Sequence, residues 1–217
     1  MKHLTALQAS VCVVALGFAS TVSADVTATE VWGNFKDQLT AGGGSALTVA
    51  AEDMSGNTLT VRDIMLMSTD PTMSATVNMG TLVFVENGDG TVTATLPNQM
   101  VLDFQETGAS DGARFKINVD ISGATMLVSG TVDDMRYDNT ADRYTVSMAE
   151  AMKGDEAMPV ELLININNVS SSQSVVKGGD ITSYTSDSTA SSLDYFVAGE
   201  DGPSQFSMSG QSTGVTV

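Results

Sequence analysis

The sequence predicts an all-β protein, built mainly from antiparallel strands, with one α-helix near its N-terminus. From residue 47 onward, apolar and polar residues alternate in run after run, which is the period that places side chains on opposite faces of a strand. Clusters of Gly, Asn, Asp and Ser separate these runs at short intervals. Helical periodicity is found in a single stretch, 27–39. A long meander, a sandwich and a curved sheet that forms a groove all fit this pattern.

Residues 1–24 have the features of a signal peptide. Lys2 and His3 precede a mostly apolar run that is too short to span a bilayer, and small residues up to Ala24 predict cleavage after that position. The alternative is an uncleaved anchor. Cys12 and His3 both leave with the peptide, so the mature chain would contain neither thiol nor imidazole. Disulfides, cysteine or histidine zinc sites and histidine-dependent catalytic triads are then excluded.

The segment 27–39 is predicted to be an amphipathic helix that covers one end of a sheet. Thr27 and Glu30 have the spacing of a capping box. One side carries the apolar residues Val31, Trp32, Phe35 and Leu39, and the other sides carry Asn34, Lys36, Asp37 and Gln38. The alternative function of this helix is to dock a partner protein.

The strongest local signal is a hairpin over 76–96. Its turn is Asn87-Gly88-Asp89-Gly90, because Asn-Gly and Asp-Gly supply the positive φ angles of tight turns. Before the turn, the apolar residues fall on odd positions and are predicted to share one face: Val77, Met79, Val83 and Val85. In the preceding strand, 58–67, the apolar phase changes between Val61 and Ile64, which predicts a β-bulge near Arg62-Asp63.

Further strands are predicted over 100–104, 115–121, 125–132, 144–148 and 160–166, with a polar loop over 133–143. We assign residues 25–169 to one β-rich domain. Residues 170–192 are rich in Ser and Thr and are predicted to be a connection, with strands polar on both faces as the alternative. Residues 193–217 show the pattern of a further hairpin, which would start a truncated second half.

The charge balance, 26 acidic against 9 basic residues, disfavours nucleic acid and charge-driven binding to anionic membranes. Four carboxylates of the polar loop are the candidate metal ligands: Asp133, Asp134, Asp138 and Asp142. Arg136 and Arg143 lie in the same loop, which favours a solvated hairpin tip instead. The Asp-Gly pairs at 89–90, 111–112 and 201–202 are typical of turns and lack the ligand spacing of an EF-hand. No catalytic residue and no cofactor are predicted.

Several short segments resemble an exported family of Gram-negative bacteria known as domain of unknown function 2125. They are Asp25-Val26-Thr27, Glu30-Val31-Trp32, residues 87–92 with Leu96-Pro97, residues 175–179, Ser192-Leu193 and residues 206–210. The resemblance implies a periplasmic β-rich protein without an assigned activity and without catalytic residues to transfer. It also implies a longer protein, of which this chain would be a fragment.

The function expected from these observations is a non-catalytic binding or scaffold protein of the periplasm or envelope, or a secreted one. Its partner would be an apolar, lipid-like ligand held in a groove, or another envelope protein. The methionines in or beside the strands suit an adaptable apolar cavity. The alternative is an extracellular protein that uses carboxylates to bind calcium or act on carbohydrate. No membrane-spanning segment is expected after signal cleavage.

Overall fold

The computed structural model describes residues 25–41, 44–108, 111–178, 181–201 and 204–216, with the side chains of residues 181, 201, 204 and 205 left out. The expected signal peptide lies outside the described residues. The described chain forms one helix, α1 (Ala28–Thr40), and thirteen strands. The strands are β1 (Ser45–Thr48), β2 (Ala51–Ser55), β3 (Thr58–Thr69), β4 (Met73–Glu86), β5 (Val92–Thr95), β6 (Gln99–Glu106), β7 (Ala113–Ser122), β8 (Thr125–Thr131), β9 (Asp134–Lys153), β10 (Glu156–Ala157), β11 (Glu161–Gly178), β12 (Ile181–Asp201) and β13 (Ser204–Thr216).

All thirteen strands belong to one antiparallel sheet, which confirms the predicted fold class. The main path through the sheet is β1-β3-β4-β5-β8-β9-β11-β12-β13. β5 and β6 lie end to end beside β4, and β8 and β7 lie end to end beside β9. The sheet therefore has two halves, joined by the strands that are long enough to run through both.

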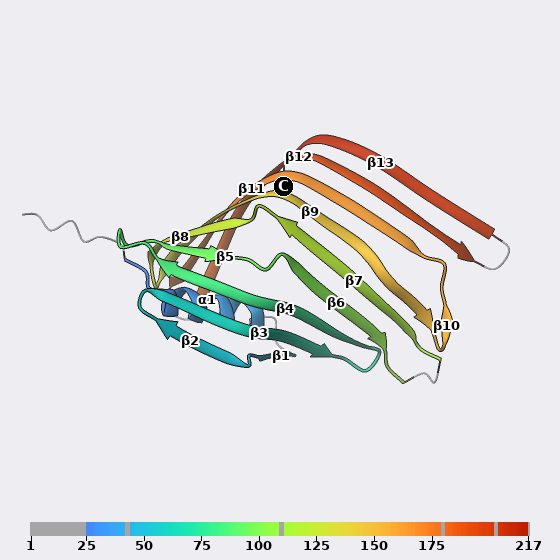
Figure 1. Ribbon diagram of the computed structural model, residues 1–217, viewed down its shortest axis with the longest axis horizontal. Coiled ribbons are helices and arrows are strands. Elements are labelled where there is room, and N and C mark those ends of the chain that lie inside the picture. Colours follow the sequence, from blue (N-terminus) through green and yellow to red (C-terminus); the bar gives the residue numbers. More distant parts are fainter. Residues whose placement is uncertain (1–24, 42–43, 109–110, 179–180, 202–203, 217) are drawn as a thin grey trace, which may run out of the picture.

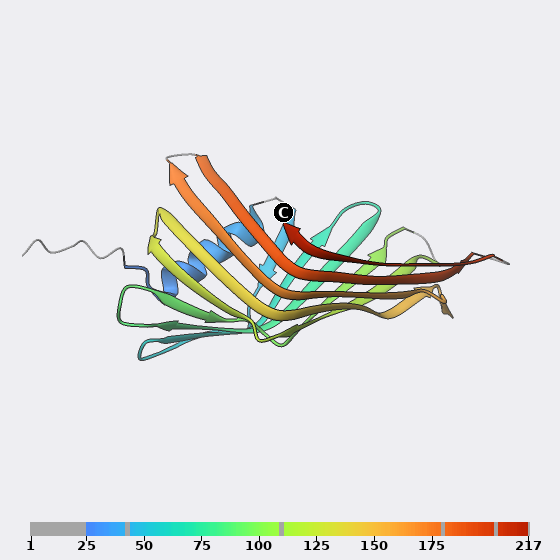
Figure 2. The same cartoon turned by 90° about the horizontal axis from the view of Figure 1, so that it is seen from above.

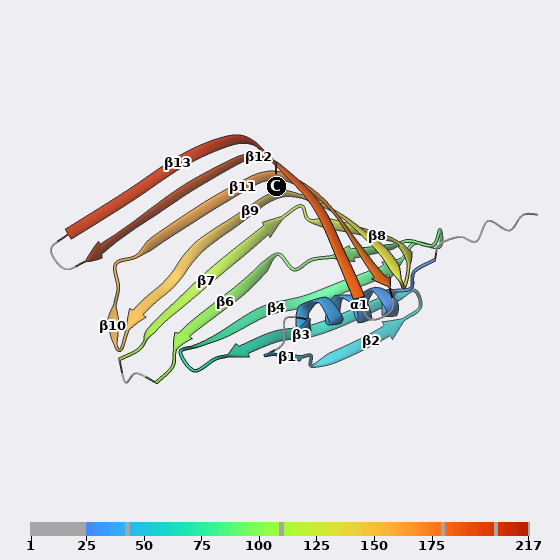
Figure 3. The same cartoon turned by 180° about the vertical axis from the view of Figure 1, so that it is seen from behind.

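The sheet is bent along the line where the two halves meet, and α1 lies inside the bend against one half (Figures 1 and 3). Seen from above, the long strands change direction near their middle (Figure 2). We call this line the fold line. The helix-covered half contains β2, β5, β8 and the adjoining parts of the long strands. The open half contains β1, β6, β7, most of β13 and the remaining parts of the long strands.

Irregular backbone marks the fold line. The bulge predicted near Arg62-Asp63 is confirmed, because the pairing of β3 with β4 shifts register between Val61 and Ile64. Asp63 (φ 52°) and Asn168 (φ 48°) are the non-glycine residues with positive φ in the described chain, and both lie on this line. An extra residue in a strand reverses which face its later side chains point to. In a strand that runs through both halves, the buried side chains consequently change between odd and even positions at the fold line.

This reversal corrects one prediction. The turn at residues 87–90 and the pairing of β4 with β5 are as expected, with Phe84 opposite Ala94. After Gly80, however, the buried residues of β4 are Leu82 and Phe84, not Val83 and Val85. Gly80 has φ 65° and sits within the register shift. The odd-numbered apolar residues therefore share a face only on the N-terminal side of Gly80.

Two segments that were expected to be irregular form strands. The predicted loop at 133–143 is the first half of β9, in which buried Met135 and Tyr137 alternate with charged residues. The Ser- and Thr-rich stretch at 170–192 lies almost wholly in β11 and β12, which pair with each other along it. This stretch therefore forms strands, which was the alternative prediction, and not a connection. Among the residues of this stretch whose burial is described, Val175 alone is buried. An alternation of apolar and polar residues therefore gave little indication of these strands.

α1 begins with the predicted capping box. Glu30 donates its backbone N–H to Thr27 Oγ1 (3.2 Å), and Thr27 donates its own to Glu30 Oε2 (2.9 Å). Glu86 of β4 adds a carboxylate that accepts from the Ala28 N–H at 2.9 Å. A helix N-terminus favours such negative charge. In the described part of the chain, no helix has the length and apolar character that crossing a membrane requires.

The core lies between α1 and the helix-covered half. Val31 and Trp32 are buried, and the Trp32 indole packs near Phe84 with ring centroids 6.1 Å apart. Phe35 and Leu39 are half-buried against the same cluster. The apolar side of α1 thus covers the sheet, as predicted, and is not available for docking a partner.

Asn34, expected away from the apolar side of α1, is nevertheless buried, with 2 % of its surface exposed. Its Oδ1 accepts hydrogen bonds from Tyr137 Oη and Gln38 Nε2, both at 2.8 Å. Burial raises the pKa of the Tyr137 phenol well above its ordinary value, so the hydroxyl keeps its proton and stays a donor. This hydrogen bond joins the helix to β9 across the core.

Tyr137→Phe is expected to lower the free energy of unfolding by about 1 kcal/mol, because the aromatic packing is kept and one buried hydrogen bond is lost. Chemical denaturation followed by circular dichroism measures this difference. If the variant is as stable as the parent, the hydrogen bond between Tyr137 and Asn34 does not help to hold α1 on the sheet.

Candidate functional site

One face of the open half is apolar across nine strands, and we call it the apolar face. Cross-strand partners lie on the same face of a sheet, so the register identifies its members. One row of partners consists of Val119, Val146, Ile164 and Tyr195. The whole set is Leu47, Leu66, Val77, Met100, Leu102, Phe104, Phe115, Ile117, Val119, Ile121, Tyr144, Val146, Met148, Leu162, Ile164, Ile166, Leu193, Tyr195, Val197, Phe206 and Met208.

The apolar face is continuous with the core but is not covered by a second layer of described elements. Leu47, Val77 and Met100 pack against the core cluster at the fold line. Farther out most side chains are half-buried by their neighbours alone, and Phe206 and Met208 are 55 % and 58 % exposed. The backbone of α1 runs close to β1, β3 and β4, its side chains also form hydrogen bonds with β9 and β11, and Figure 2 shows it beside one half of the sheet. Uncovered apolar surface of this extent makes the apolar face the candidate binding surface.

The opposite face of the open half is mostly polar, with a few apolar residues such as Leu163 and Phe196 among the polar ones. Thr145 Oγ1 donates to Asn165 Oδ1 (2.9 Å), and Arg143 Nε donates to Asn167 Oδ1 (2.8 Å). Asn167 Nδ2 in turn donates to Ser192 Oγ at 2.9 Å. These cross-strand bonds satisfy the side chains without any covering layer. The contrast between the two faces means that water is expected on the polar one and an apolar partner on the other.

Two clefts open on the apolar side of the fold line. The first, about 270 Å³, lies between α1 and the bend and is lined by Phe35, Leu82, Met100, Ile121, Tyr137 and Tyr144. The second, about 380 Å³, lies across β9, β11, β12 and β13 and is lined by Tyr144, Ile166, Val169, Ala190, Leu193 and Val215. Tyr144 forms a wall of both. Mostly apolar clefts with a few polar atoms are typical of small-molecule sites, although these two are smaller than most such sites.

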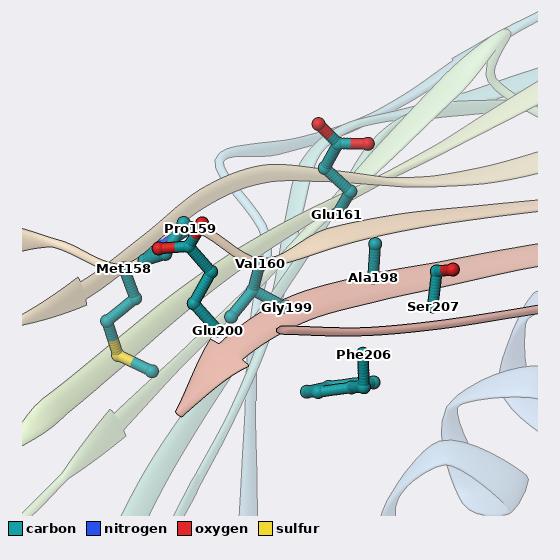
Figure 4. A pocket seen from close by; sticks show the side chains of 9 residues that line it. All are labelled: Met158, Pro159, Val160, Glu161, Ala198, Gly199, Glu200, Phe206 and Ser207. Carbon is teal, nitrogen blue, oxygen red and sulfur yellow. The ribbon is translucent and has the colours of Figure 1, made fainter. Parts of the chain in front are cut away.

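A third hollow, of about 550 Å³, lies at the far ends of β11, β12 and β13 (Figure 4). Glu161 and Phe206 point to opposite sides of the strands there. The hollow therefore wraps around the end of the sheet, where both faces meet solvent.

The four candidate metal ligands do not converge. Asp134 and Asp138 are four residues apart on the extended β9, a separation of about 13 Å. Asp138 accepts from Arg136 Nε at 2.9 Å, and Asp142 lies against Gly123 at the fold line. Asp133 is exposed in the turn before β9. Among the described residues, no three His, Cys, Asp or Glu side chains come together in a way that could hold a metal ion.

The turn at Asp89-Gly90 uses its carboxylate locally. Asp89 Oδ1 accepts from Thr91 Oγ1 (2.6 Å) and from the Thr91 N–H (3.1 Å). These hydrogen bonds, the side-chain one first, hold the pKa of Asp89 below its ordinary value. Asp70 has the same arrangement with Thr72, with the same lowered pKa. Turn formation accounts for these oxygens without an ion, and the Asp201 side chain lies outside the described part.

A scan against protein-family models found no match to this chain, and searches of curated proteins and of solved structures found none either. The resemblance to domain of unknown function 2125 therefore stays a prediction. The site has to be interpreted from its own geometry, which offers a broad apolar surface and two clefts at its inner end.

Proposed function

We propose that this chain is a non-catalytic binding protein of the bacterial periplasm or envelope that holds an apolar, lipid-like ligand on the apolar face. The observation that carries the proposal is the uncovered set of apolar side chains across the open half, opposite a mostly polar face. Burying apolar surface is favourable by about 25 cal/mol per Å². A hydrocarbon chain would gain this energy on such a surface without needing a charged anchor.

The clefts at the fold line support an elongated ligand. Ile121 and Tyr144 belong to the apolar face and also line the cleft beside α1. A chain lying on the open half would thus continue into a partly enclosed end, where contacts are made on several sides. The resemblance to an exported family and the predicted signal peptide support a location outside the cytoplasm.

The ligand test uses two adjacent residues of β11 that point to opposite faces. Ile164→Lys places a charge on the apolar face, and Leu163→Lys places the same charge on the polar face, where Leu163 is already 41 % exposed. We expect Ile164→Lys to weaken binding of the fluorescent probe N-phenyl-1-naphthylamine by about tenfold, because a buried charge costs free energy beside an apolar ligand. Leu163→Lys should bind the probe like the parent protein.

Native mass spectrometry after gentle purification gives an independent measurement. Co-purified apolar molecules should appear as added mass on the parent and on Leu163→Lys, and should be reduced on Ile164→Lys. Circular dichroism controls for folding of both variants. An apo mass for the parent together with no probe uptake would contradict the proposal, and so would equal binding by the two lysine variants.

A further inference from the structure

The two edges of the sheet differ in how they are protected against pairing with another strand. At one edge β3 is flanked by two short strands, β1 and β2, of four and five residues. β2 carries Glu52 and Asp53, which form ion pairs with Lys36 and Arg62. Short, charged edge strands are how proteins prevent edge-to-edge association. This edge is therefore protected by the shortness of both strands and, along β2, by charge.

The other edge, β13, has neither protection. Its thirteen residues contain no charged side chain, and β12 is its one neighbour among the described strands. One row of its backbone N–H and C=O groups consequently has no strand partner in the described chain. β13 also carries the two most exposed large apolar residues, Phe206 (55 %) and Met208 (58 %), at the border of the apolar face.

The charges beside this edge indicate what would pair with it. On β12, Asp194 and Glu200 lie on the polar face, and the sequence contains no Lys or Arg after Lys177. In the register of β12 with β13, Gln211 is opposite Asp194 and Gln205 is opposite Glu200. The alternate positions between these two glutamines are small, with Ser207 opposite Ala198 and Ser209 opposite Phe196, so each serine is diagonal to a carboxylate. A strand added to β13 would lie about 10 Å from β12. Long basic side chains on that strand can extend over the serines towards the carboxylates.

We propose that β13 is a docking edge for an extended segment of another protein in which apolar residues alternate with Lys or Arg. The apolar residues would continue the apolar face beside Phe206 and Met208, and the basic residues would lie on the polar face beside the β12 carboxylates. Backbone hydrogen bonds give such strand addition its affinity, and the alternating side chains give its specificity. A second copy of this chain fits less well, because its β13 would bring Ser and Gln but no basic group. The inference does not depend on the lipid-like ligand.

The probe is a fluorescein-labelled peptide of four valines alternating with three lysines, and binding is followed by fluorescence polarisation. We expect it to bind about tenfold more tightly than the matching peptide of valine and glutamate, through a few exposed charge pairs. The lysine peptide with N-methyl groups on alternate residues, which keeps the charge and removes strand donors, should lose binding. A full affinity for the N-methylated peptide would overturn strand addition.

Three variants locate the site. Ser209→Lys and Asp194→Asn change the charge at the proposed edge and should each weaken the lysine peptide several-fold. Met54→Lys changes the charge equally on β2, where Met54 is 49 % exposed, and should leave the affinity unchanged. Hydrogen exchange should slow at backbone amides of 206–216 when the peptide binds. Protection elsewhere would overturn the proposal, as would concentration-dependent protection of 206–216 in the protein alone, which would indicate a second copy.

Discussion

Trp32→Ala is expected to lower the free energy of unfolding by about 3–5 kcal/mol, the usual effect of removing a large buried aromatic side chain. The indole is 1 % exposed and lies between α1 and the sheet, with ring centroids 6.2 Å from Phe35 and 6.1 Å from Phe84. Lys36 Nζ lies 5.2 Å from its centroid. The melting temperature should fall by about 10 °C. Circular dichroism is the appropriate probe, since Trp32 is the single tryptophan of the chain.

Trp32→Phe is the matched control. It keeps an aromatic ring against Phe84 and should recover at least half of the loss. If the alanine variant melts like the parent, α1 does not hold the core together, and the assignment of the helix-covered half as the stable part of the molecule is wrong.

Gly130→Ala is expected to cost about 3 kcal/mol, through backbone geometry and not through lost contacts. Gly130 pairs with Met135 in the β8–β9 hairpin and has φ 104°, a region that L-residues rarely adopt. A Cβ there would lie 2.1 Å from the backbone oxygen of Asp134. That oxygen cannot move away without displacing Met135, which is fully buried.

Gly88→Ala separates the cost of a positive φ angle from the cost of the clash with a neighbouring strand. Gly88 has φ 79°, but a Cβ at this position meets no atom within 4 Å. Its substitution should therefore cost only the conformational term, about 1 kcal/mol. Denaturant titration of both variants gives the difference. Equal stability of the two alanine variants would contradict the close approach of the β8 and β9 backbones at Gly130.

Local rules in the sequence were enough for the helix, the turn at 87–90 and the bulge at Arg62-Asp63, because each depends on a few neighbouring residues. These rules failed where pairing with a distant strand determines the local structure. Ser- and Thr-rich strands such as those over 170–192 are held by their neighbours, and their composition resembles that of a linker. The wrong phase for Val83 and Val85 has a similar origin, because the register shift at Gly80 involves two strands at once.

The candidate site was predictable in its parts and not in its assembly. Alternation picks out the residues of the apolar face strand by strand, for example Ile117 and Val119 in β7 and Ile164 and Ile166 in β11. It cannot show whether a second sheet covers them, since the inner face of a sandwich has the same pattern. The proposed role of β13 as a docking edge likewise depends on the order of strands, which periodicity does not encode.

The long strands also determine how the molecule comes apart. β9, β11 and β12 each pass through both halves. If the single-layered region melted alone, these strands would have to be disrupted at the fold line while their other ends stayed paired beneath α1. Both regions should then unfold as one cooperative unit, with one transition by every spectroscopic signal. A ligand that binds the open half would accordingly raise the melting temperature of the entire domain, including the transition that Trp32 fluorescence reports from the other half.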